Sequence, residues 1–238
     1  MRWGVALGGS FAFTAILALA WLAPFAAPAA ASPPPAARPS FTAAPRASTE
    51  PSDPPRRPRI GPFAIPVAGA ELPSEAALLP EAARDHRAGV HEGVDIVAEE
   101  GTPVLAMAAG RVIRLDHDFV EWSAEERASA FLAAHALGYT PSYTLDRTRG
   151  RQVWIDHGGG VVTRYAHLSS VAALPPGAYV APGTEIGAVG SSGYPAGGPH
   201  LHFEIRVGDS YLGEGLTAAQ LAHALRRALR GRPSVEGP

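Results

Sequence analysis

The sequence of 238 residues contains no cysteine and no lysine. Without cysteine the chain has no disulfide bonds, no thiolate metal sites and no cysteine nucleophiles. Any transition-metal site must therefore be built from histidine and carboxylate side chains. Without lysine, every basic side chain with a permanent charge is an arginine.

The absence of lysine and two further absences exclude three classes of function. The formal net charge of -2 supplies no broad basic field of the kind that holds nucleic acid, although the arginines within 38–59 form a local positive stretch. The segment 101–112 looks like the hairpin framework of a biotinyl or lipoyl carrier, but such carriers attach their cofactor to a lysine. The segment 157–160 looks like an esterase oxyanion loop, but no Gly-x-Ser-x-Gly sequence supplies the nucleophile.

The N-terminal segment 1–31 has the composition of a targeting sequence. Arg2 precedes a long uncharged, apolar run, and the run ends in three alanines of the kind that signal peptidase accepts. Because about 20 apolar residues also suffice to cross a bilayer, the segment is predicted to be a signal peptide or an N-terminal membrane anchor. Residues 32–59, rich in proline and alanine, predict a disordered linker.

Short β-branched runs separated by glycine and proline fill much of the chain after residue 60. They lie at 110–113, 152–155, 161–165, 178–180, 185–189 and 202–206. Strands of this length with turns between them indicate an antiparallel sheet. We therefore predict a mostly β domain over residues 60–215.

Two helices interrupt this pattern. Ser123 and Glu126 form a capping box for a helix that ends near Leu137, where Gly138 can close it.

The second helix is predicted in the C-terminal segment 216–238. Thr217 and Gln220 form its capping box, and it ends near Gly231. One face is an apolar stripe that predicts packing, made of Leu221, Leu225 and Leu229.

A pair of histidines, His200 and His202, lies in the run 198–206. On a strand both imidazoles project from one face, while Leu201 points to the other. One face of this strand therefore carries two nitrogen ligands or bases.

A second polar cluster spans residues 91–95. Gly93 and the β-branched residues that follow favour an extended chain over a His-Glu-x-x-His zinc helix. In an extended chain His91 and Asp95 share a face, and Glu92 is turned away and is not the general base. Gly93 is then expected to leave room for an ion to approach. Two histidines and one carboxylate are a known ligand set for catalytic zinc, whose fourth position is left to water.

These clusters belong to a larger set of segments: 91–96, 101–112, 153–171, 181–193 and 198–206. Together they resemble the M23 or LytM-type peptidoglycan metallopeptidases, the family that includes lysostaphin. They follow the order of that family and cover most of residues 86–206. The resemblance implies a LytM-type antiparallel β-sheet groove domain.

The resemblance also implies a function for five polar residues. One Zn²⁺ would be held by His91, Asp95 and His202, and His167 and His200 would be catalytic. The implied reaction is zinc-dependent endopeptidase hydrolysis of peptide cross-links or stem peptides of bacterial peptidoglycan. We expect an exported monomer in the periplasm, the cell wall or the medium, with peptidoglycan peptides and no nucleic acid as partners.

The two catalytic roles stay open at this point. His200 is the candidate general base, and His167 is the candidate for a hydrogen bond to the developing oxyanion. An imidazole pKa near 6.5 suits either task. The alternative function is a LytM-type non-hydrolytic regulator that activates a cell-wall amidase. Such regulators have lost zinc ligands, whereas all five polar positions are present here, which favours the enzyme.

Residues 117–150 depart from the family pattern and are predicted as a helical insertion. The insertion could shape substrate choice or act as a lid, or it could be neutral decoration. Arg84 and Arg87, shortly before His91, are candidates for pairing with carboxylates of stem peptides.

Overall fold

The computed structural model describes residues 63–229. The signal peptide or anchor, the linker over 32–59 and the helix end near Gly231 lie outside the described residues. Within 63–229 no helix combines the length and hydrophobicity needed to cross a membrane.

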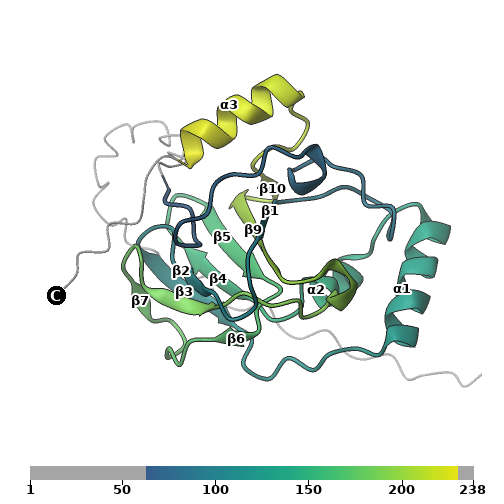
Figure 1. The fold of residues 1–238 in the computed structure, drawn as a ribbon, viewed down its shortest axis with the longest axis horizontal. Coiled ribbons are helices and arrows are strands. Elements are labelled where there is room, and N and C mark those ends of the chain that lie inside the picture. The colour runs from purple at the N-terminus through teal and green to yellow at the C-terminus, as the bar shows by residue number, and fades with distance from the viewer. Residues whose placement is uncertain (1–62, 230–238) are drawn as a thin grey trace, which may run out of the picture. The chain divides into compact units, whose positions relative to one another are not determined.

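Ten strands and three α-helices make up the described chain (Figure 1). The strands are β1 (Val94–Val97), β2 (Pro103–Leu105), β3 (Gly110–Leu115), β4 (Val153–Asp156), β5 (Val161–Ala166), β6 (Ser170–Val171), β7 (Tyr179–Val180), β8 (Glu185–Ala188), β9 (His200–Val207) and β10 (Ser210–Tyr211). The helices are α1 (Ala124–Leu137), α2 (Ser142–Arg149) and α3 (Ala218–Ala228), with 3₁₀ turns η1 (Ala76–Leu78) and η2 (Pro195–Gly197).

The strands form two antiparallel sheets. The larger has the order β1-β9-β5-β4-β3-β7 with β10 paired to β9, and the smaller has the order β2-β8-β6. Every strand pair is antiparallel. The predicted fold class, mostly β with an inserted helix and a C-terminal helix, is confirmed.

Strand β9 lies between β1 and β5 and separates the core from the polar site. Its alternate residues Leu201, Phe203 and Ile205 belong to the hydrophobic core. The residues between them, His200, His202 and Glu204, are buried but polar. Because successive side chains of a strand point to opposite faces, one face of β9 packs the core and the other carries the polar groups.

Helix α3 completes the hydrophobic core. Leu221, Leu225 and Leu229 are buried in it, as the apolar stripe predicts, and the predicted Thr217–Gln220 capping box is present. The backbone N–H of Phe63, at the start of the described chain, donates to the carbonyl of Ala228 at 2.5 Å. The end of α3 is thereby joined to the first described residues.

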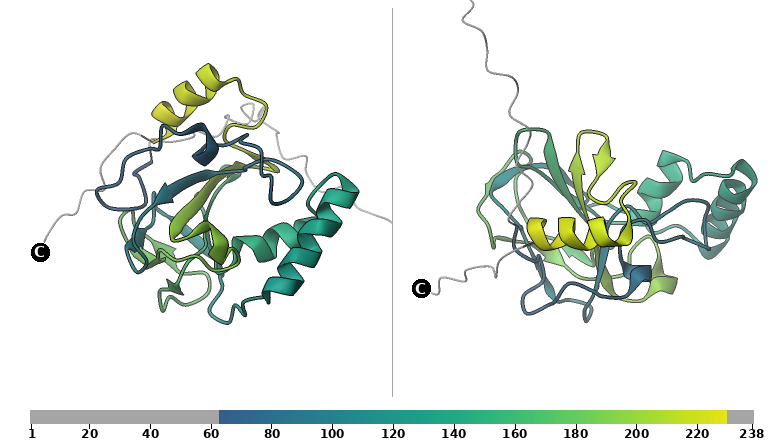
Figure 2. Two further views of the ribbon diagram at one scale, coloured as in Figure 1. Left: turned by 45° about the vertical axis from the view of Figure 1, so that its right-hand side comes forward. Right: turned by 90° about the horizontal axis from the view of Figure 1, so that it is seen from above.

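Residues 117–150, the predicted insertion, contain two helices, where the sequence predicts one. Helix α1 has the predicted capping box and ends at Gly138 in the left-handed conformation, φ 76°. The prediction missed α2, because its N-cap is Pro141, which makes no side-chain capping bond that a sequence pattern would reveal. Both helices lie on one side of the larger sheet, away from α3 (Figure 2).

Candidate metal centre

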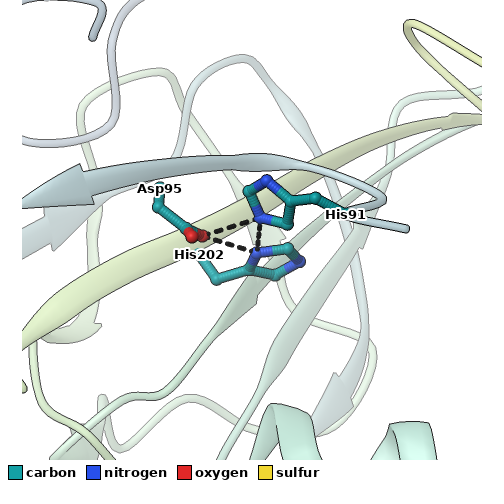
Figure 3. Close-up of side chains that lie close together, drawn as sticks. All are labelled: His91, Asp95 and His202. Atoms are coloured by element: carbon teal, nitrogen blue, oxygen red, sulfur yellow. Dashed lines mark hydrogen bonds and ion pairs between the residues drawn. The ribbon is translucent and has the colours of Figure 1, made fainter. Parts of the chain in front are cut away.

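The three predicted ligands meet at the junction of β1 and β9 (Figure 3). Asp95 of β1 lies directly opposite His202 of β9 in the antiparallel register. His91 precedes β1 in the chain, so the strand is shorter than the sequence predicts, yet its ring reaches the same point. His91 Nε2 lies 2.9 Å from Asp95 Oδ1 and 2.8 Å from His202 Nδ1, and His202 Nδ1 lies 2.8 Å from Asp95 Oδ1.

The other nitrogen of each ring is held by an acceptor outside this cluster. His91 Nδ1 lies 2.9 Å from the carbonyl oxygen of Leu79, and His202 Nε2 lies 3.1 Å from Oε1 of Glu204. When these nitrogens donate their protons outward, the neutral rings keep a lone pair on the inward nitrogen. Metal-binding histidines in proteins are oriented in the same way by carbonyls and carboxylates.

The two carboxylate oxygens of Asp95 make different contacts. Its Oδ2 accepts a hydrogen bond of 2.7 Å from Arg84 Nη2, and its Oδ1 faces the two rings. Arg84 is thereby committed to Asp95, which argues against the prediction that it pairs with a substrate carboxylate.

These contacts bring three lone-pair atoms together, and that donor set fits a cation. Three acceptors facing one another repel unless a proton or a positive ion lies between them. A tetrahedral zinc ion with ligand distances of about 2.0–2.2 Å separates its ligand atoms by roughly 3.3–3.6 Å. The three residues, all buried, could therefore hold a metal ion after their ligand atoms separate by only about 0.5 Å.

The pKa shifts agree with a site built for positive charge. Burial lowers the pKa of His91 to about 4, so this ring is neutral at pH 7. Burial also disfavours protonation of His202, but hydrogen bonds to Asp95 and Glu204 outweigh it and raise the pKa. The position between these two carboxylates thus favours a positive charge, which a cation held by Asp95 and His202 would supply in place of a proton.

Gly93 is needed for a reason different from the predicted one. A Cβ atom at this position would lie 2.4 Å from the carbonyl oxygen of Phe203 and 2.8 Å from Cε1 of His202. The missing side chain therefore makes room for the neighbouring strand and its imidazole, whereas the expectation that it leaves room for an ion stays a prediction.

The remaining two predicted site residues lie beside the ligands. The ring centroids of His167 and His200 are 4.6 Å apart, and those of His167 and His202 are 5.8 Å apart. His200 Nε2 lies 3.9 Å from Asp95 Oδ1. The structure thus brings all five predicted polar residues into one cluster.

Backbone carbonyls orient both of these additional rings. His167 Nδ1 lies 2.8 Å from the Ser192 oxygen and His200 Nδ1 lies 2.9 Å from the Gly198 oxygen, so each neutral ring presents an unprotonated Nε2. His167 also has a left-handed backbone, φ 60°, which is uncommon for a residue with a side chain. Such strained conformations concentrate at functional sites.

The cluster forms one wall of a pocket of about 470 Å³, within the range of ligand-binding sites in proteins. Glu92 also lines the pocket, but its Oε2 accepts 2.6 Å and 2.8 Å hydrogen bonds from Arg149 and Arg206. This pairing supports the prediction that Glu92 is not the general base.

The insertion contacts the loops that surround the pocket. Trp122 donates from Nε1 to the carbonyl of Gly193 at 2.7 Å, and Phe131 of α1 contacts the rings of His86 and Tyr194. His86 and Tyr194, which both line the pocket, are stacked with centroids 4.4 Å apart. These contacts favour a role in shaping the pocket over neutral decoration.

Sequence reasoning missed two charged residues that support His202. Glu204 is fully buried, and its Oε1 accepts a 2.6 Å hydrogen bond from Arg149 Nε, at the end of α2. Burial alone would raise the pKa of Glu204, but Arg149 and His202 hold it well below its usual range. The alternation along β9 could have placed Glu204 on the histidine face, whereas no local pattern relates it to Arg149, 55 positions away.

We predict that Glu204→Gln weakens metal binding by about 10- to 100-fold, because the carboxylate that orients His202 is lost. Equilibrium competition with a chromogenic chelator measures this change. Glu185→Gln, on the exposed end of β8, is the matched control. Unchanged metal affinity in Glu204→Gln would show that Glu204 does not support the ligand.

The sequence of this chain is similar to those of known proteins. The model of peptidase family M23 matches residues 89–213. DD-carboxypeptidase/endopeptidase Mpg of Neisseria meningitidis is 34% identical over 122 residues, which are 51% of this chain and 21% of that protein. Cell division protein DipM of Caulobacter vibrioides is 32% identical over 116 residues, 49% of this chain and 14% of that protein. The match thus spans about a fifth or less of the length of these relatives.

Solved structures similar to this chain include a zinc-containing peptidase from Vibrio cholerae. It is 25% identical with a TM-score of 0.44, and the match covers 63% of this chain and 38% of that one. The catalytic domain of lysostaphin from Staphylococcus simulans is also 25% identical, with a TM-score of 0.36 and coverage of 62% and 80%.

The family match includes all five clustered residues and extends over more than half of the chain. The resemblance in the sequence motifs is thereby confirmed: the chain belongs to peptidase family M23.

Proposed function

We propose that this protein is a zinc-dependent endopeptidase that hydrolyses peptide cross-links or stem peptides of bacterial peptidoglycan. One observation carries the proposal: His91 Nε2, His202 Nδ1 and Asp95 Oδ1 converge within 2.9 Å, and their outward partners leave each with a free lone pair. Membership of a peptidase family, and the similarity to a DD-carboxypeptidase/endopeptidase, support a peptide as the substrate.

The ligand set supports zinc as the metal. Two imidazoles and one carboxylate suit zinc and leave a fourth position for water, as catalytic zinc sites require. When bound, zinc supplies a Lewis acid for the scissile carbonyl and lowers the pKa of its water toward neutrality. His91, Asp95 and His202 are the residues that would hold it.

His200 and His167, beside the ligands, are the candidates for proton transfer. In neutral form, His200 presents an unprotonated Nε2 beside Asp95, suited to accept a proton from the attacking water. His167 presents the same atom, and burial first, then the nearby His200, lower its pKa well below 6.5. Donation to a developing oxyanion requires a proton on Nε2, which the lowered pKa of His167 disfavours in the free protein. We therefore assign His200 as general base on its position beside Asp95, and His167 as a donor only after it takes up a proton from solvent as the oxyanion forms.

Purified protein incubated with cell-wall sacculi tests the proposal. We expect new uncross-linked or shortened muropeptides by mass spectrometry, loss of cleavage with a chelator, and recovery with Zn²⁺. A protein that holds no zinc and releases no fragment, but stimulates a cell-wall amidase, would replace the enzyme with the regulator. Peptidoglycan lies outside the cytoplasmic membrane, so cleavage would support an exported protein.

A further inference from the structure

A buried guanidinium without a carboxylate partner lies in the wall of the pocket. Arg87 is only 6% exposed and lines the same pocket as the metal ligands. Its Nη2 donates to the carbonyl of Val90 at 2.9 Å, and its Nη1 donates to Oγ1 of Thr140 at 3.3 Å. Among the described residues, no carboxylate oxygen lies within 4.0 Å of a guanidinium nitrogen of Arg87, the limit for an ion pair.

The other arginines around this wall differ from Arg87. Each forms an ion pair with a carboxylate, so that four guanidinium groups share three carboxylates. The four arginines are Arg84, Arg149, Arg164 and Arg206, and the carboxylates are Glu92, Asp95 and Glu204. Together with Arg87 this group has five guanidinium groups and three carboxylates, so it carries an excess of positive charge that a bound divalent cation would increase.

Gly89 leaves room for Arg87 on one side, and Thr140 contacts it on the other. A Cβ atom on Gly89 would lie 3.0 Å from Arg87 Nη1, and Gly89 has φ 128°, a conformation that residues with side chains rarely adopt. On the other side, Thr140 of the insertion accepts from Arg87 and donates to the carbonyl of Ala88. The insertion thus helps to hold a charged group that has no carboxylate partner within residues 63–229.

Such a charge is costly to bury. Burial lowers the pKa of Arg87 to about 10, so the guanidinium still carries its charge at neutral pH. A buried charge with only neutral partners is stabilised when an anion binds to it. A carboxylate suits this site because the planar guanidinium can donate charge-assisted hydrogen bonds to it.

We propose that Arg87 binds a free carboxylate of the peptide close to the scissile amide. The preferred substrate is then an anionic peptide, such as a cross-link whose diamino acid keeps a carboxylate beside the cleaved bond, and not an uncharged glycine bridge. This inference rests on the proposed endopeptidase function. The same chemistry occurs at the C-terminal carboxylate of an uncross-linked stem peptide, which is the second possible source.

Matched synthetic peptides test the proposal on the purified full chain. The first pair is a cross-linked peptide in two forms: the carboxylate beside the scissile amide is free in one and converted to a carboxamide in the other. A second pair is a stem peptide with a free or an amidated C-terminus, and pentaglycine is the uncharged reference. We expect wild-type kcat/KM to be about 10- to 100-fold higher for the free carboxylate in one pair, the size of effect typical of a hydrogen bond to a charged group. The pair that shows the preference identifies the source of the carboxylate.

Variants then assign the preference to Arg87. Arg87→Gln should lose most of it through slower cleavage of the carboxylate peptide, with the carboxamide peptide within about threefold of wild type. Arg87→Lys should retain part of it, since it keeps the charge without the planar fork. Arg111→Gln, an exposed arginine of β3, should change nothing. Zinc content and thermal unfolding check that each variant is folded.

The outcomes separate this inference from the proposed function. Equal cleavage of carboxylate and carboxamide peptides by wild type, or rapid cleavage of pentaglycine, would overturn the role of Arg87 and leave the peptidase in place. A full preference in Arg87→Gln would assign carboxylate binding to another group. If zinc-loaded wild type cleaves none of the peptides, the endopeptidase proposal itself fails.

Discussion

His202→Ala is expected to release the metal and to abolish hydrolysis. His202 provides one of the three inward lone pairs, and its loss leaves His91 and Asp95 as a two-ligand site. The free energy of zinc binding in four-ligand sites is about 10–16 kcal/mol, which corresponds to roughly 3–4 kcal/mol for each ligand. Loss of one ligand should therefore lower the zinc affinity by about 10²- to 10³-fold. Elemental analysis of the purified variant measures bound zinc, and muropeptide release measures activity.

Thermal unfolding gives a second readout of the same change. A ligand that binds only the folded state stabilises it by about 4 kcal/mol at 1,000 times its Kd, so zinc should raise the Tm of metal-free wild type. The Tm of His202→Ala should respond much less at the same zinc concentration. The control is His223→Ala, an exposed histidine of α3, which should bind zinc and hydrolyse sacculi as wild type does. Normal zinc content in His202→Ala would remove the ligand assignment.

The face of β9 that carries the site follows from local sequence. Alternation along 198–206 predicts that His200 and His202 share a face, and both are buried on the polar side of the strand. The capping boxes at Ser123 and Thr217 likewise predict the starts of α1 and α3, because capping involves residues only three positions apart.

Local sequence patterns could not predict features that depend on contacts between distant segments. The pairing of Asp95 with His202 joins segments 107 residues apart, and only the family resemblance brings them together before the structure does. Arg149 supports Glu204 from a helix without a side-chain cap. Gly93 was identified correctly as a critical position, but its steric reason depends on the neighbouring strand β9, which a local analysis does not include.

The arrangement of the five polar residues divides them into two kinds. Three direct lone pairs at one another, whereas His167 and His200 line the pocket beside that cluster, each with Nδ1 next to a backbone carbonyl. Loss of a residue of the second kind should therefore separate catalysis from metal binding.

His200→Ala and His167→Asn are expected to lower kcat by about 10²- to 10⁴-fold and to retain bound zinc, because proton transfer in the transition state contributes that much. Asparagine is chosen at 167 because it tolerates the left-handed backbone of φ 60° better than alanine does. Elemental analysis and kinetics on a defined cross-linked peptide measure the two quantities, with His223→Ala again as the control.

The pH profile then distinguishes the two rings. A general base must be unprotonated, so kcat/KM falls as the pH drops below its pKa, and the variant without the base loses this acidic limb. Burial keeps the pKa of His167 well below 6.5, so a base at this position would remain active in acid far below pH 6.5. The assignment of His200 as base predicts that His200→Ala flattens the acidic limb and that His167→Asn keeps it. The reverse result would exchange the two roles, and full activity in either variant would exclude that residue from the reaction.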